Sequence, residues 1–201
     1  VWLAGTGANQ FHHLTFAGAG IRAEAGASFS VSGNLATAGV GSFTHLPDGT
    51  GELTLTGSSK TIGGAGLNFS RLRVTGSLTT TASFNVAGHL GVDGSLTATA
   101  GTISLTGTNQ LLYGSGTISL FALSIPGVAT TTNNFSLGAD LAVNGSFTAT
   151  AGTATFAGST VFSGTANLHH ATLNGTLLRL AAGSTLRLAG NTSLLAGGFD
   201  S

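Results

Sequence analysis

Charge is nearly absent from this sequence: only 6% of its 201 residues are Asp, Glu, Lys or Arg, against about 25% in typical globular domains. Six acidic and six basic side chains cancel, which removes the electrostatic basis for binding nucleic acid or an anionic membrane. Cysteine is absent, so disulfides and thiolate chemistry are excluded. No apolar run approaches the roughly 18–20 residues of a membrane-spanning helix, and we therefore expect no transmembrane segment.

Disorder is excluded by what the chain does contain. Disordered segments combine high net charge with few large apolar residues, whereas here the net charge is zero and 41% of the residues are hydrophobic. Phe, Leu, Val and Ile recur along the whole length, which is long enough to bury a continuous core. The composition therefore indicates an ordered chain.

The most informative feature is an internal repeat. Residues 89–107 read HLGVDGSLTATAGTISLTG, and residues 140–158 read DLAVNGSFTATAGTATFAG. Four short motifs mark the same point in successive units of about fifty residues: FHHL at 11–14, FSRL at 69–72, LFAL at 120–123 and LHHA at 168–171. We place the repeats approximately at 1–57, 58–107, 108–158 and 159–201, in a single domain spanning 1–201.

Within each unit, apolar and small polar residues alternate with period two, as in Leu90 and Val92 or Leu141 and Val143. This alternation is typical of β-strands. Thr, Val, Phe and Ile favour strands, and Gly, Asn and Asp fall at the breaks between them. The sequence therefore predicts an all-β protein.

Two architectures fit these strands. The pairs Asp93-Gly94 and Asn144-Gly145 are good two-residue hairpin signals and favour an antiparallel β arrangement. Roughly six short strands that recur in the same order favour a parallel β-helix, in which equivalent side chains stack along the axis. We prefer the parallel β-solenoid, with coils of about 25 residues, about eight coils and a stack of roughly 38 Å.

The motifs SLTATAGTISLTG, LAVNGSFTATAGTATFAG and GSTLRLAG resemble the Gly/Thr/Ser-rich repeats of large secreted bacterial surface proteins, such as haemagglutinin-like exoproteins and autotransporter passenger domains. The resemblance covers nearly the whole chain and is one of composition and rhythm. It implies a right-handed β-helix exported to the cell surface, where it serves as a stalk, adhesin or fibre. It assigns no functional residue.

The sequence begins at the point in the repeat where it would next continue after its last residue. Residues 1–5, VWLAG, align with the last strand of each unit and so complete a preceding repeat, and the chain closes just before the same point. Without an initiator Met or a signal peptide, we expect a processed product or a piece of a longer chain. Open coil ends expose unpaired backbone, so we predict head-to-tail self-association or continuation of a longer array. The predicted assembly interface comprises Val1, Trp2, Leu3 and Phe199.

Histidine is the most conspicuous candidate for metal binding, since His12-His13 and His169-His170 occupy equivalent positions in the first and fourth units. Adjacent strand residues point to opposite faces, so neither pair is expected to chelate one ion alone. The two pairs are expected about six coils apart, roughly 29 Å, far beyond a metal–nitrogen bond. We predict neither a metal site nor a cofactor.

Acid catalysis needs clustered carboxyl groups or an acid beside a basic partner. The only local cluster is His45, Asp48 and Glu52, in a loop that the other units lack. A solvated loop is the simpler interpretation of that cluster, and a turn is the simpler interpretation of Asp93, because Asn144 takes the same position. Arg71, Arg73, Arg179 and Arg187 are interpreted as surface charges. We therefore expect no enzymatic activity.

Threonine spacing supports one further hypothesis. The segments Thr97-Ala98-Thr99, Thr148-Ala149-Thr150 and Thr153-Ala154-Thr155 resemble the Thr-x-Thr spacing of ice-binding solenoids, which would need a rank of hydroxyls on every coil. The motif recurs in only some strands, and β-propensity explains it more simply. For a glycan, only Trp2 and Tyr113 offer polar-tipped aromatic platforms.

The sequence thus predicts a non-enzymatic structural β-solenoid at the cell surface or outside the cell, as a fibre subunit or a segment of a large adhesin. The alternative is a carbohydrate- or ice-binding module that uses a flat Thr/Ser face.

Overall fold

The chain is a parallel β-solenoid in a computed structural model that describes residues 2–5, 9–18, 20–46, 50–175 and 177–200. Every strand pairing in these ranges is parallel, and each pairing joins a strand to the equivalent strand of the next coil. The described residues contain no helix. The preference for a parallel solenoid over an antiparallel arrangement is confirmed.

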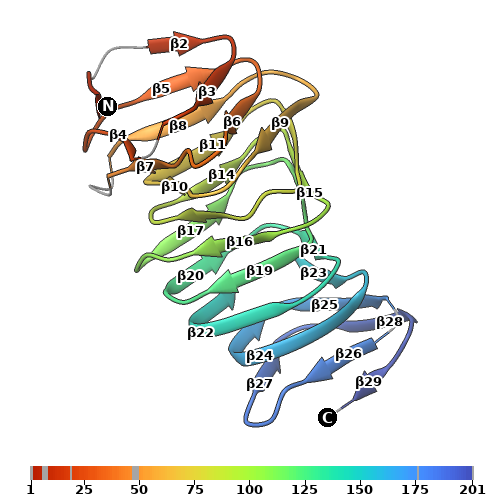
Figure 1. Ribbon diagram of the computed structural model, residues 1–201. Helices are drawn as coiled ribbons and strands as arrows, with labels where there is room; N and C mark the ends of the chain where they lie inside the picture. Colours follow the sequence, from red (N-terminus) through yellow and green to blue (C-terminus); the bar gives the residue numbers. More distant parts are fainter. Residues whose placement is uncertain (1, 6–8, 19, 47–49, 176, 201) are drawn as a thin grey trace.

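Three strands per coil build three faces, which Figure 1 shows stacked along one axis. The first face comprises β1 (Trp2–Leu3), β4 (Ile21–Ala23), β7 (Phe43–His45), β10 (Leu67–Phe69), β13 (Phe84–Val86), β16 (Thr102–Leu105), β19 (Ala122–Ile125), the first parts of β22 (Leu141–Ala149) and β24 (Ser159–Leu168), β26 (Leu177–Leu180) and β29 (Phe199–Asp200). The second face comprises β2 (Asn9–Phe11), β5 (Phe29–Val31), β8 (Glu52–Leu55), β11 (Arg71–Val74), β14 (Leu90–Val92), β17 (Gln110–Tyr113), β20 (Val128–Thr131), the second parts of β22 and β24, and β27 (Thr185–Leu188). The third face comprises β3 (Leu14–Phe16), β6 (Leu35–Thr37), β9 (Lys60–Gly63), β12 (Ser77–Thr80), β15 (Ser95–Ala98), β18 (Thr117–Leu120), β21 (Phe135–Leu137), β23 (Thr153–Phe156), β25 (His170–Asn174) and β28 (Thr192–Ala196).

One apolar core runs through the coils. Strand residues alternate between the interior and the outside, as in β16, where Ile103 and Leu105 are fully buried and Thr102 and Ser104 are not. Each fully buried Leu or Phe contributes roughly 1.5–3 kcal/mol relative to an exposed one. Phe43 is a local centre of this core: its ring stacks on Phe16 at 4.5 Å and lies 5.9 Å from Phe69. Apolar packing and backbone pairing therefore hold the stack together with few charges.

The predicted coil length is wrong. Leu67 pairs with Phe84, and Phe84 pairs with Ile103, so successive coils in the middle of the chain are shorter than expected. The coil that leads from Leu35 to its partner Ile62 is a longer exception. The chain therefore makes about ten turns instead of eight, a stack of about 48 Å at ~4.8 Å per coil. The number of turns is higher because the corners between strands contain fewer residues than the predicted coil of about 25 residues requires.

The fifty-residue units do not stack directly on one another either. Leu90 lies in β14 on the second face, whereas its sequence equivalent Leu141 lies in β22 on the first face. A unit holds eight strand segments, and three segments complete a coil, so each unit advances by two and two-thirds turns. The sequence repeat therefore rotates by one face per unit, and only local strand-and-corner geometry is repeated.

The four marker motifs follow this rotation. Each is a tight corner in which one or two residues separate two strands. The corners lie between the second and third faces at 11–14, between the first and second at 69–72, between the third and first at 120–123, and again between the second and third at 168–171. Three units therefore return the chain to its starting corner.

Candidate functional surfaces

The third face carries an uninterrupted row of hydroxyl side chains over eight consecutive coils. Register pairs connect each member to the next, from β9 to β28: Thr61, Thr79, Thr97, Ser119, Ser136, Thr155, Thr172 and Ser193. We call this set the hydroxyl row. The Thr-x-Thr motifs do occur in only some strands, and Thr148 lies on the second face; the row is continuous because serines occupy the positions where threonines are missing.

The other two faces lack a comparable row among their described residues. On the first face, the outward residues of four successive strands are Thr44, Asn68, Asn85 and Ser104. Two asparagines therefore interrupt the hydroxyl side chains. The amide of Asn85 donates to Asn68 Oδ1 at 2.7 Å, so these two side chains bridge adjacent coils. On the second face, Arg73 and Gly91 interrupt the outward row. The hydroxyl row is therefore a property of one face.

The loop cluster considered as a catalytic candidate is not assembled. His45 is 1% exposed, and its ring points into the core, 5.6 Å from Phe29 and 6.4 Å from Phe43. Glu52 points outward from β8, where its carboxylate accepts a hydrogen bond from Thr54 at 3.4 Å. Asp48 lies outside the described residues. The two described members therefore face opposite sides of the coil wall.

The expectation that adjacent histidines point to opposite faces is wrong. The rings of His12 and His13 lie 4.3 Å apart, and those of His169 and His170 lie 4.1 Å apart. The reason is that both pairs lie where the chain turns from the second face to the third, and neither pair forms two consecutive residues of one strand. The two pairs are also eight coils apart rather than six, about 38 Å at ~4.8 Å per coil.

Both histidine corners connect neighbouring coils. His13 Nδ1 accepts the backbone N–H of Asn34 at 2.9 Å, and His170 Nδ1 accepts that of Asn191 at 2.8 Å. A ring nitrogen that accepts a hydrogen bond is occupied and unprotonated. No group of three or more potential metal ligands occurs within the described ranges, and the rings of His13 and His170 hydrogen-bond to the next coil there.

His89 makes a third hydrogen bond of this kind, and its pKa is shifted. Its Nδ1 accepts the backbone N–H of Leu111, one coil on, at 3.1 Å. Desolvation by burial lowers the pKa of His89 below its ordinary 6.5, and the nearby Arg71 lowers it further. Protonation would remove the acceptor, so the neutral ring is the form that the fold stabilises.

We expect acid to weaken the fold through His89. The folded state binds this proton less readily than the unfolded state, so the stability is fully present above pH 6.5 and is lost as the pH falls from there through the lowered pKa of the folded state. Urea unfolding at neutral and at successively lower pH, on the wild type and on His89→Gln, measures the effect. The wild type should lose more stability on acidification than the variant, and identical losses would contradict the assignment.

Arg73 and Asp93 form a well-defined ion pair. Arg73 Nη2 lies 2.8 Å from Asp93 Oδ2, and Arg73 Nε donates to the same oxygen at 2.9 Å. Asp93 is thus both a turn residue and the partner of a cation one coil earlier. Arg179 and Asp200 lie 4.0 Å apart and are largely exposed. Both pairs are surface contacts between coils, and such exposed pairs contribute at most about 1 kcal/mol.

The predicted assembly interface is only partly described. Val1 lies outside the described residues, and β1 pairs with β4 through Trp2 and Leu3. Leu3 is partly buried against the core. Phe199 is 54% exposed, although it pairs with Leu178, which is 1% exposed. Whether these residues contact another coil stays a prediction.

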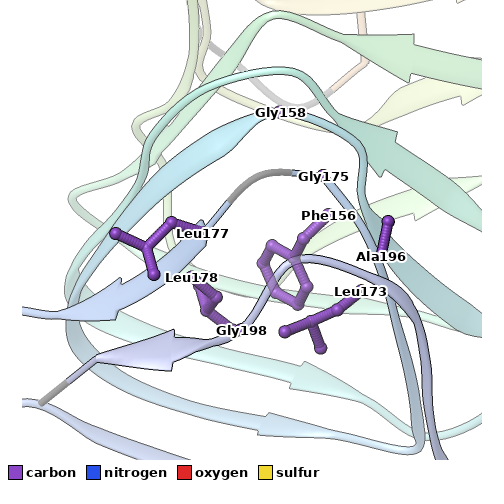
Figure 2. Close-up of a pocket in the computed structure, with 8 residues that line it drawn as sticks. All are labelled: Phe156, Gly158, Leu173, Gly175, Leu177, Leu178, Ala196 and Gly198. Atoms are coloured by element: carbon purple, nitrogen blue, oxygen red, sulfur yellow. The ribbon is translucent and has the colours of Figure 1, made fainter.

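Near the C-terminus, apolar side chains line the corner between the third and first faces. Figure 2 shows Phe156, Leu173 and Leu178 pointing into the interior beneath Gly158 and Gly175. The depression they line has no room for a water molecule. It belongs to the core and is not a ligand site.

No protein-family model matches the chain, and no curated protein or solved structure is significantly similar to it. Within the described ranges, no helix is long and apolar enough to cross a membrane. The fold and its surfaces therefore carry the functional argument.

Proposed function

We propose that the chain is a structural, non-enzymatic segment of a fibre or large adhesin at the cell surface or outside the cell. The observation that carries this proposal is the unbroken apolar column inside a stack of parallel coils, in which neighbouring coils are joined by backbone hydrogen bonds. Such a stack resists bending and leaves few exposed loops for proteases. The resemblance to haemagglutinin-like and autotransporter repeats supports the extracellular setting.

Apolar side chains on the last described coil support contact with a further coil. Leu194 pairs with Leu173, and Phe199 pairs with Leu178, yet Leu194 and Phe199 are 59% and 54% exposed where their partners are 2% and 1% exposed. Covering them with another β-coil, from a second copy or a longer array, would bury this surface. We propose that assembly proceeds end to end.

Electron microscopy and sedimentation of the purified chain test end-to-end assembly. We expect rods whose lengths are multiples of the single stack, and we expect Leu194→Lys with Phe199→Lys to return them to single stacks. Phe121→Lys is the matched control, because Phe121 is 40% exposed and lies between β18 and β19, in the middle of the stack. A wild-type chain that stays monomeric at high concentration would exclude self-assembly.

The hydroxyl row supports a second candidate function, the flat Thr/Ser binding face. Its members repeat at about the 4.7–4.9 Å spacing of adjacent strands, and a regular hydroxyl array of this kind can order water at an ice surface. Thermal hysteresis of the purified chain tests it. We expect hysteresis that Thr97→Lys and Thr155→Lys abolish and that Ser104→Lys, on the first face, does not. No hysteresis in the wild type would eliminate this candidate.

A further inference from the structure

A different surface, on the second face, combines an aromatic ring with apolar and hydroxyl groups. Leu111 and Tyr113 both point outward from β17, and Leu111 is 44% exposed. Leu111 pairs in register with Thr130 of β20, which pairs with Thr148 of β22. The large side chains of Leu111 and Tyr113 therefore lie beside threonines of the next two coils.

Tyr113 is held in place by its neighbours on the preceding coil. Its register partner is Gly91, where an added Cβ would lie 2.7 Å from Tyr113 Cζ. Glycine at this position thus lets the phenol ring lie against the backbone. The His89 ring contacts it edge-on, with centroids 6.4 Å apart and an interplanar angle of 88°. The ring is therefore packed against the backbone and the His89 ring of the preceding coil.

A groove of about 380 Å³ opens beside this ring. Leu111 and Tyr113 form its apolar wall, and Thr130, Thr132 and Thr150 line the rest of it; the Thr130 hydroxyl also donates to the backbone carbonyl of Gln110 at 3.4 Å. The volume lies within the ~300–1,000 Å³ of small-molecule sites. None of the described residues that line it is charged, so the groove suits a neutral ligand.

We propose that this groove binds a neutral pyranose unit of a glycan. A pyranose ring has the same division of chemistry: its C–H face packs against Tyr113 and Leu111, and its hydroxyls reach the threonines. The ion pair of Arg73 and Asp93 belongs to the same outward row, because Arg73 pairs in register with Gly91. It offers donors and acceptors to a second sugar unit beyond the tyrosine.

The glycan site is separate from the hydroxyl row, which lies on the third face. It also does not depend on end-to-end assembly, since β17, β20 and β22 are in the middle of the stack. A stalk that carries this site would hold a surface polysaccharide along its side.

Amide chemical-shift titration with cellobiose, lactose and N,N′-diacetylchitobiose tests the proposal. At least one disaccharide should shift Leu111, Tyr113 and Thr130 with a dissociation constant on the order of 1 mM. Tyr113→Ala should weaken binding by about tenfold or more, whereas Tyr113→Phe keeps the ring and should stay within about threefold. Ser104→Ala, on the first face, is the control and should bind like the wild type.

Three outcomes would overturn the proposal: no shifts with any of the three sugars, equal binding by a folded Tyr113→Ala, or shifts confined to the hydroxyl row. Circular dichroism of each variant establishes that it is folded. Because the sugar titration needs only the monomer, its failure leaves end-to-end assembly untouched.

Discussion

Gly127→Ala should lower the free energy of unfolding by about 3 kcal/mol or more, at the upper end of overpacking effects. Gly127 lies at the corner between the first and second faces, and a Cβ added there would overlap the carbonyl oxygen of Gly107 on the preceding coil. That same oxygen accepts the backbone N–H of Val128 at 3.0 Å. Added bulk would separate the coils and break this hydrogen bond.

The effect should be strong because the corner repeats. A Cβ on Gly145, one coil further on, would overlap the Gly127 oxygen in the same way, so the backbone there cannot move outward without disturbing the next coil. Gly63→Ala is the matched control, since no atom lies within 4 Å of its would-be Cβ. Urea unfolding of both variants measures the difference. Equal, small losses would show that the coils are not packed as closely as described.

Phe43→Ala should cost about 3–5 kcal/mol, the usual range for removing a buried phenylalanine. Its ring is fully buried and contacts Phe16, Phe29 and Phe69 from three other strands. Because these strands belong to neighbouring coils, the cavity would weaken several coil contacts at once. Thermal and urea unfolding of Phe43→Ala and of the control Val40→Ala, whose parent side chain is 85% exposed, provide the test.

A Phe43→Ala protein as stable as Val40→Ala would contradict the aromatic core. Hydrogen exchange of the variant adds spatial detail. Because a solenoid is stabilised mainly by nearest-neighbour contacts, protection should fall most in β4, β7 and β10, and least in β25 and β28.

The all-β class followed from the sequence because it depends on local alternation, and the parallel stack was preferred because short strands recur in the same order. Leu90, Val92, Ile103 and Leu105 alternate with small residues and are all fully buried. The length of a coil did not follow, because it depends on the lengths of the corners. The marker motifs turn within one or two residues, whereas the coil between Leu35 and Ile62 has much longer connections.

The overestimated coil length also concealed the hydroxyl row and the groove beside Tyr113. With the longer coils that the sequence predicted, Thr97 and Ser119 would not meet, but the actual register pairs them. Gly91 and Tyr113 likewise become neighbours only because the coil that joins them is short. Counting serine together with threonine at the spacing of these short coils would have revealed the row from the sequence. The histidine contacts needed the corner geometry, which no periodicity encodes.

Electron–electron distance measurements between spin labels on the third face test the parallel stack most directly. With one label at position 61 and a second at 136, 155 or 172, the register places the pairs four, five and six coils apart. The backbone separations should then be about 19, 24 and 29 Å, rising by ~4.8 Å per coil. Distances that do not rise in equal steps, or that fall between positions 136 and 172, would contradict coil-on-coil stacking in this register.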